Sequence, residues 1–107
     1  MQRGEVWWVS FDQAMGGEIQ KVRPAIIVSN NAFNDTMNRV QVVPLTSNVT
    51  RCYPCEAYVT IAGKQGKAMA DQLVTVSKLR LKTKLGKISA TDLHNVENAI
   101  KIQLDLL

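Results

Sequence analysis

The chain has 107 residues, a net charge of +4 and a hydrophobic content of 46%, which fits one small domain over residues 1–107 with a single core. Two cysteines are too few for a disulfide scaffold, and no run approaches the ~18 apolar residues of a membrane-spanning helix. Because the first residues lack the apolar segment of a signal peptide, we expect a soluble cytoplasmic protein with no membrane partner.

The first predicted element is a strand over residues 5–11 (EVWWVSF). Trp7, Val9 and Phe11 share one face, and apolar residues also occupy the other face. Such a strand belongs in a closed barrel or at a subunit interface. The following residues, 12–21, read as a loop whose flexible point is the glycine pair ending at Gly17.

Two further buried strands are predicted in the first half of the chain, over residues 24–29 and 40–45. The segment between them, residues 30–38, is polar and accommodates one short helical turn. Pro44 lacks a backbone N–H, so it suits an edge strand or a bulge better than a central position.

The second half of the chain is predicted to add short strands and one helix. Residues 55–61 alternate apolar and polar side chains, and a turn at 63–66 leads to short strands at 67–70 and 73–76. Many short strands followed by one helix predict a mainly β fold, a small barrel with a helix packed on it.

The C-terminal helix is expected to start after Ser89, because Ser89 and Asp92 match the capping-box pattern. An apolar stripe at helical spacing follows, and its members are Leu93, Val96, Ile100, Leu104 and Leu107. This stripe is the face that we expect to cover the barrel.

Charge is uneven along the chain. Residues 51–87 contain eight basic residues against two acidic ones, a net charge of +6. A basic segment of this kind attracts polyanions. It is equally compatible with a solvated face that has no partner.

The two cysteines, Cys52 and Cys55, have the C-x-x-C spacing of redox and zinc sites. Zinc usually needs four ligands, and His94 is the only other candidate ligand of this type. Pro54 favours extended backbone before it, and three extended residues span roughly 10 Å, beyond the ~7 Å that a disulfide tolerates. We therefore interpret Cys55 as a small core residue and Cys52 as a loop residue.

Polar groups gather at two strand boundaries. Arg23 precedes the strand that starts at Pro24, and an arginine held there can clamp a phosphate with its bidentate fork. A surface arginine on the barrel rim is the alternative. Thr46, Ser47 and Asn48 end another strand and offer hydroxyl and amide groups to a polar ligand.

Five motifs occur in order along the chain and are followed by the terminal helix. They are RGEVWWV at 3–9, GEIQKVRPAIIVSN at 17–30, VPLTSN at 43–48, YPCE at 53–56 and DQLVTV at 71–76. This order resembles the MazF/PemK (Kid) family of toxin endoribonucleases of type II toxin–antitoxin systems, from start to finish.

The resemblance implies an SH3-like barrel of about five to seven strands, a homodimer in the cytoplasm of a bacterium or archaeon, and no cofactor. It implies sequence-specific cleavage of single-stranded RNA and a cognate antitoxin that occupies the RNA groove. By position, Arg23 and Thr46 match the family's catalytic residues, and Glu18 matches a residue with an acid–base or supporting role. The implied RNA contacts are Phe11, Gly17, Lys21, Ser47, Asn48 and Gln72.

The residue types fit a nuclease that works without metal, since the carboxylates are scattered and two-metal sites need them clustered. RNA supplies its own nucleophile, the 2′-hydroxyl, so the enzyme must orient that oxygen and stabilise charge on the phosphorane. The products would be a 2′,3′-cyclic phosphate and a 5′-hydroxyl. Glu18, a water molecule or the substrate itself could be the general base.

Two other functions stay open at this point. A CcdB-like gyrase poison shares the fold, although that family carries a tryptophan near its C-terminus and residues 104–107 contain none. A non-catalytic barrel that binds RNA through residues 51–87 would show salt-sensitive binding without cleavage.

Overall fold

The computed structural model describes residues 1–11 and 21–106, and these residues form seven strands, two α-helices and two 3-10 helices. The strands are β1 (Glu5–Ser10), β2 (Val22–Ile27), β3 (Arg39–Thr46), β4 (Glu56–Ile61), β5 (Lys64–Met69), β6 (Val74–Ser77) and β7 (Leu81–Lys87). The helices are α1 (Asn31–Thr36), η1 (Ala70–Gln72), η2 (Lys78–Arg80) and α2 (Ala90–Gln103). None of the helices in these ranges has the length and apolar character needed to cross a membrane.

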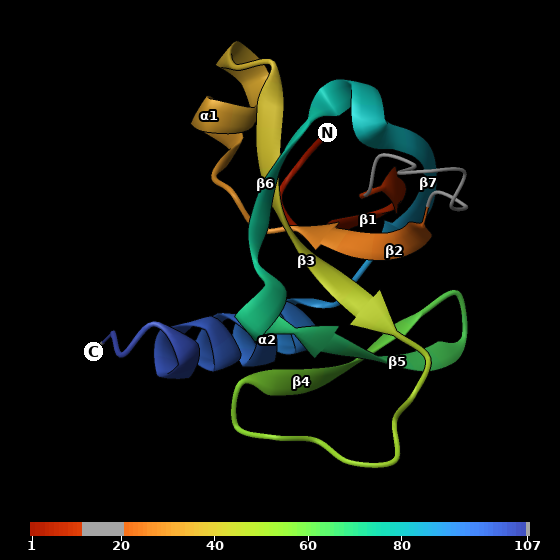
Figure 1. Ribbon diagram of the computed structural model, residues 1–107, viewed down its shortest axis with the longest axis vertical. Coiled ribbons are helices and arrows are strands. Elements are labelled where there is room, and N and C mark those ends of the chain that lie inside the picture. Colours follow the sequence, from red (N-terminus) through yellow and green to blue (C-terminus); the bar gives the residue numbers. More distant parts are fainter. Residues whose placement is uncertain (12–20, 107) are drawn as a thin grey trace, which may run out of the picture.

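The strands form one antiparallel sheet in the order β4-β5-β3-β2-β1-β7, and β6 pairs with β3 beside that path. The sheet curls into a half-barrel, with α1 at one end and α2 running along β4 at the other (Figure 1). The prediction of a mainly β, small barrel-like fold with a C-terminal helix is therefore confirmed.

The central strands contribute side chains to two separate cores, which explains why β1 and β2 carry apolar residues on both faces. Val6 and Ile26 belong to a core that includes Val96 of α2, whereas Val9 and Ile27 belong to a second core inside the curl of the sheet. Side chains alternate between faces along each strand, so neighbouring apolar residues serve different cores.

Pro44 lies in β3, which is a central strand of the sheet. The expectation that Pro44 marks an edge strand was therefore wrong. On one side Pro44 pairs with Ala25 of β2. On the other side, the pairing of β3 with β6 ends at Val42, and its pairing with β5 begins at Leu45. The proline therefore stands where β3 changes partners, and there its missing N–H leaves no donor without a partner.

The turn between β4 and β5 and the strand β7 differ from the sequence expectation. The turn between β4 and β5 comprises Ala62 and Gly63 rather than 63–66, and both residues have positive φ (52° and 76°), as a two-residue hairpin of type I′ requires. Strand β7 was not predicted, because residues 81–87 carry three lysines and only Leu81 is buried. Backbone pairing with β1 is what makes this segment a strand.

Helix α2 begins as predicted, with the Ser89 hydroxyl accepting from the Asp92 N–H at 3.1 Å. The Asp92 carboxylate, however, accepts from the N–H of Thr60 at 2.9 Å, so it ties the helix to β4. Leu104 was expected in the buried stripe but is 52% exposed, because the helix ends at Gln103. Leu107 lies outside the described residues.

Candidate active site

Strands β2 and β3 bring together the two predicted catalytic residues. Ala25 pairs with Pro44 in this antiparallel ladder, and continuing the register by two residues along each strand puts Arg23 opposite Thr46. Both side chains are partly buried, and they line one hollow of about 350 Å³ together with Ser47. A phosphate in this hollow would meet a guanidinium and hydroxyl groups.

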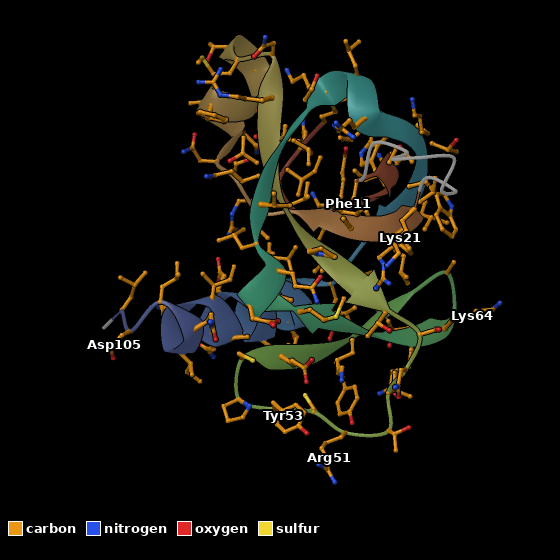
Figure 2. All side chains as sticks on the ribbon, in the orientation of Figure 1. Phe11, Lys21, Arg51, Tyr53, Lys64 and Asp105 are labelled. Carbon is orange, nitrogen blue, oxygen red and sulfur yellow. The ribbon has the colours of Figure 1, made fainter. Side chains whose placement is uncertain are left out.

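A second hollow of about 210 Å³ shares Arg23 and adds three of the predicted RNA contacts, Phe11, Lys21 and Gln72. Figure 2 shows Phe11 and Lys21 next to each other at the level of β2. The Phe11 N–H donates to the Lys21 carbonyl at 3.1 Å, which joins the end of β1 to the start of β2. An aromatic ring, two cations and an amide thus surround one opening.

Arg80 holds the chain in place where segment 12–20 begins. Its Nη1 donates to the carbonyls of Ser10 and Phe11, each at 3.0 Å. Phe11 is therefore positioned by a cation that lies sixty-nine residues further along the chain. Sequence reasoning missed this contact, because nothing in the local sequence of η2 points to Phe11.

The hydroxyl of Thr46 accepts a hydrogen bond from the Asn48 N–H at 3.2 Å, and the Asn48 Oδ1 accepts from the Thr50 N–H at 3.2 Å. These two turns shape the start of the loop after β3. Because Thr46 is engaged there as an acceptor, its hydroxyl proton is available for donation to a ligand oxygen.

The Arg23 guanidinium makes no hydrogen bond or ion pair with any side chain in the described ranges 1–11 and 21–106. Among the residues that the structure describes, the Gln72 Nε2 donates only to the sulfur of Met69, at 3.6 Å, and sulfur is a weak acceptor. Both residues can therefore engage a ligand without breaking a strong side-chain contact with the described part of the chain.

The structure thus places six of the predicted site residues around two adjoining hollows, namely Phe11, Lys21, Arg23, Thr46, Ser47 and Gln72. Asn48 is exposed beside Ser47 but lines neither hollow. Gly17 and Glu18 lie outside the described residues. Sequence reasoning missed the residues that form the walls of the hollows, Trp8, Pro44 and Val74.

Several charges of the basic segment 51–87 have structural partners. Lys84 pairs with Glu5 at 3.0 Å and Lys67 pairs with Glu56 at 3.1 Å. Both cysteines are free thiols, Cys52 exposed and Cys55 half-buried, so Cys55 is less enclosed than a core residue. Within the described part of the chain, no three His, Cys, Asp or Glu residues cluster as a metal site would require.

The sequence matches one family over residues 2–104, described as PemK-like, MazF-like toxin of type II toxin–antitoxin system. The chain belongs to this PemK/MazF toxin family. The predicted resemblance is therefore confirmed, and the order of motifs along the chain was a correct guide to the family.

Among relatives, the endoribonuclease MazF9 of Mycobacterium tuberculosis is 39% identical over 115 aligned positions, covering 99% of this chain and 98% of that protein. The endoribonuclease toxin MazF of Escherichia coli is 29% identical, covering 92% and 89%. Among solved structures, a MazE–MazF complex from Deinococcus radiodurans has a TM-score of 0.86 at 26% identity, covering 100% of this chain and 97% of that chain. A mycobacterial endoribonuclease in complex with its cognate antitoxin has a TM-score of 0.83 at 27% identity, with the same coverage.

Proposed function

We propose that this protein is an endoribonuclease toxin that cuts single-stranded RNA at specific sequences without a metal ion. The observation that carries the proposal is the shared hollow, in which Arg23 and Thr46 converge from two paired strands. Membership of the PemK/MazF family supports it, as do relatives that are named endoribonucleases.

In the proposed reaction the 2′-hydroxyl oxygen of the RNA attacks the adjacent phosphorus and the bond from phosphorus to the 5′-oxygen breaks. Arg23 clamps the phosphate and stabilises the charge that develops on its oxygens. Thr46 donates a hydrogen bond from its hydroxyl to a non-bridging oxygen of that phosphate and keeps its proton. The 2′-hydroxyl loses its proton and the leaving 5′-oxygen gains one, which gives a 2′,3′-cyclic phosphate and a 5′-hydroxyl.

The second hollow suits the recognition of unpaired bases. Single-stranded RNA is commonly recognised by stacking of splayed bases on aromatic rings and by contacts with cations and amides. Phe11, Lys21 and Gln72 supply these groups beside the shared Arg23, and Ser47 and Asn48 offer polar groups on the other side. A bound strand would therefore pass across both hollows.

We further propose that the protein works as a homodimer and is inhibited by a cognate antitoxin. Structural neighbours that contain an antitoxin support the second point. Trp8 supports the first, because it is 38% exposed and lies beside a mainly apolar hollow that also contains Leu45, Ile61 and Leu85. Light scattering of the purified protein should give twice the chain mass of 11.9 kDa.

The decisive experiment compares Arg23→Ala with the wild type on a long mixed RNA pool. We expect cleavage to fall roughly 10³-fold or more, as for arginines that stabilise phosphoryl transition states. Arg39→Ala is a matched control, since Arg39 is an exposed arginine at the start of β3 and lines neither hollow. Circular dichroism would verify that both variants fold.

The same assay tests the nucleophile. A substrate with 2′-deoxyribose next to the scissile phosphate should resist cleavage at that bond, because no hydroxyl is there to attack. Cleavage of that bond, or near-normal activity of a folded Arg23→Ala variant, would refute the proposal. A parallel gyrase assay would separate it from the gyrase-poison alternative.

A further inference from the structure

The loop that joins β3 to β4, residues 47–55, is fixed to the sheet by side chains from the strands below it. The Lys67 ammonium donates to the carbonyl of Arg51 at 2.7 Å, and the Tyr58 hydroxyl donates to the carbonyl of Val49 at 2.9 Å. The Glu56 carboxylate accepts from the Tyr53 N–H at 3.0 Å. Three separate side-chain contacts thus hold a loop that contains no helix or strand.

Lys67 lies at the centre of these contacts. It is only 7% exposed, and its ammonium also pairs with the Glu56 carboxylate at 3.1 Å. In the sheet Lys67 pairs with Thr46 of β3 on one side and with Tyr58 of β4 on the other. One buried cation therefore connects the strand that carries the catalytic threonine with the loop that follows it.

A lysine is rarely buried without a strong reason, because its charge must be compensated. Here Glu56 compensates the charge and the Arg51 carbonyl takes a further N–H. If the loop moved away, the ammonium would lose one acceptor in a site that water barely reaches, which is costly. The burial of Lys67 consequently favours the loop geometry in which the Arg51 carbonyl faces the ammonium.

What the loop presents to solvent is a stacked pair. The Arg51 guanidinium lies 5.7 Å from the centre of the Tyr53 ring and donates to its hydroxyl at 3.0 Å. Tyr53 is 51% exposed, and both side chains stand at the outer edge of the molecule (Figure 2). An exposed ring with a cation beside it is the kind of surface on which an unpaired base stacks.

We propose that Lys67 is a positioning residue that sets base selection, by holding loop 47–55 so that Tyr53 and Arg51 receive a base flanking the cleaved bond. The inference rests on the proposed function, because it takes single-stranded RNA as the ligand. Ser47 lines the hollow that contains Arg23 and Thr46, whereas Arg51 and Tyr53 lie further along the same loop. The base that they read is therefore outside the two nucleotides joined by the cleaved bond.

The test maps the 5′ ends produced from a mixed RNA pool by the wild type, Tyr53→Ala and Lys67→Met. Because Lys67→Met leaves the Glu56 carboxylate buried without its partner, it could fail to fold. The double variant Lys67→Met/Glu56→Met removes both charges and keeps similar volumes, a change that buried ion pairs often tolerate. Lys82→Met is the matched control, since Lys82 is an exposed lysine of β7 outside both hollows.

We expect Tyr53→Ala and the folded Lys67 variants to lose preference at the same flanking position. Discrimination there should fall roughly tenfold, in line with what base–aromatic stacking contributes. The cut should stay at the same bond, KM for the best substrate should rise more than kcat falls, and amide exchange of residues 47–55 should become faster. Lys82→Met should match the wild type.

If the wild type cuts selectively and the folded Lys67 variants keep the same base preference, the role of Lys67 is overturned and the proposed function is not. An equal loss of kcat on all RNAs with unaltered amide exchange would also overturn it, since Lys67 would then act in the chemistry. A wild-type protein that cuts no RNA would overturn the proposed function, and base selection with it, whatever the loop does in the exchange measurement.

Discussion

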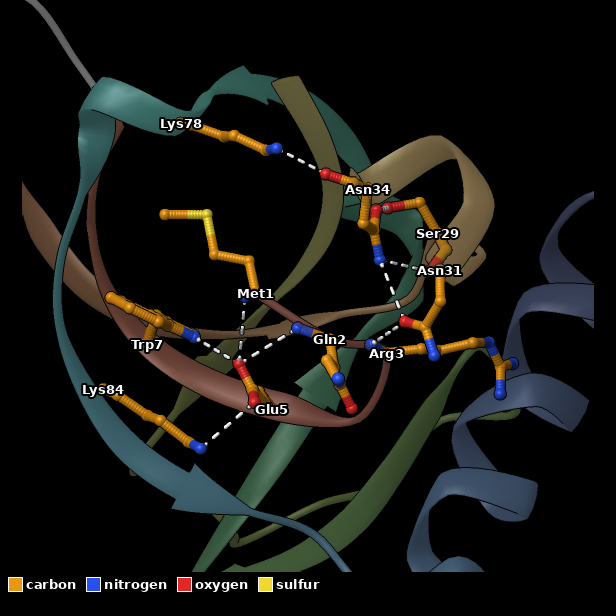
Figure 3. A network of polar contacts seen from close by, with 10 residues as sticks. All are labelled: Met1, Gln2, Arg3, Glu5, Trp7, Ser29, Asn31, Asn34, Lys78 and Lys84. Carbon is orange, nitrogen blue, oxygen red and sulfur yellow. Dashed lines mark hydrogen bonds and ion pairs between the residues drawn. The ribbon is translucent and has the colours of Figure 1, made fainter. Parts of the chain in front are cut away.

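Glu5 is a nearly buried carboxylate whose ionisation should contribute strongly to stability. It is 8% exposed and accepts from the Trp7 indole N–H and the Gln2 backbone N–H at 3.0 Å each, while its other oxygen lies 3.0 Å from the Lys84 ammonium (Figure 3). Burial alone would raise its pKa, but the hydrogen bonds from Trp7, Gln2 and Lys84 outweigh that effect and lower the pKa from 4.5 to about 2.

The sign and size of the effect follow from this shift. Because the pKa of Glu5 is lower in the folded state than in the unfolded chain, its stabilisation is complete above pH 4.5 and is lost as the pH falls towards 2. A shift of this size corresponds to roughly 3 kcal/mol of unfolding free energy, at about 1.4 kcal/mol per pKa unit.

The perturbation is Glu5→Gln, and the assay is urea unfolding followed by circular dichroism between pH 7 and pH 2. The difference in unfolding free energy between wild type and variant should shrink by roughly 3 kcal/mol over this range. Asp35→Asn is the control, because it removes a carboxylate that is exposed on α1, and it should keep the wild-type pH dependence. A Glu5→Gln variant with that same pH dependence would refute the reasoning.

Three further predictions concern the site and the helix. Thr46→Val should lower kcat on RNA by roughly 10²-fold, as loss of one donor to a developing oxyanion does, and a folded variant of near-normal kcat would exclude that role. EDTA should leave the rate of RNA cleavage unchanged, because Arg23 and Thr46 supply the proposed charge stabilisation; a strict Mg²⁺ requirement would contradict it. Ser89→Ala removes the acceptor of the Asp92 N–H at 3.1 Å and should lower the unfolding free energy in urea by about 1 kcal/mol; an unchanged value would mean that the cap is dispensable.

The helix start and most strands could be predicted from the sequence, because each depends on residues close together in the chain, and the family could be predicted from the order of short local motifs. Ser89 caps the helix through a residue three positions away, and residues 56–61 alternate within a single strand. Strand β7 could not be read in this way. Its lysines interrupt the apolar pattern by which a strand is recognised. Its strand geometry comes from backbone pairing with β1, about eighty residues earlier in the chain.

For the candidate site too, the sequence predicted the residue types, and the tertiary structure decided which side chains meet. The motif order by itself identified Arg23 and Thr46 as the residues to test, because their types suit a phosphate and their neighbours match the family. Only the tertiary structure decided that β2–β3 pairing brings them to one hollow, and that Lys67 lies buried between Thr46 and the loop. Strand register is set by contacts between distant segments and by the burial of whole faces, so the partners of a polar side chain become known only when the sheet has formed.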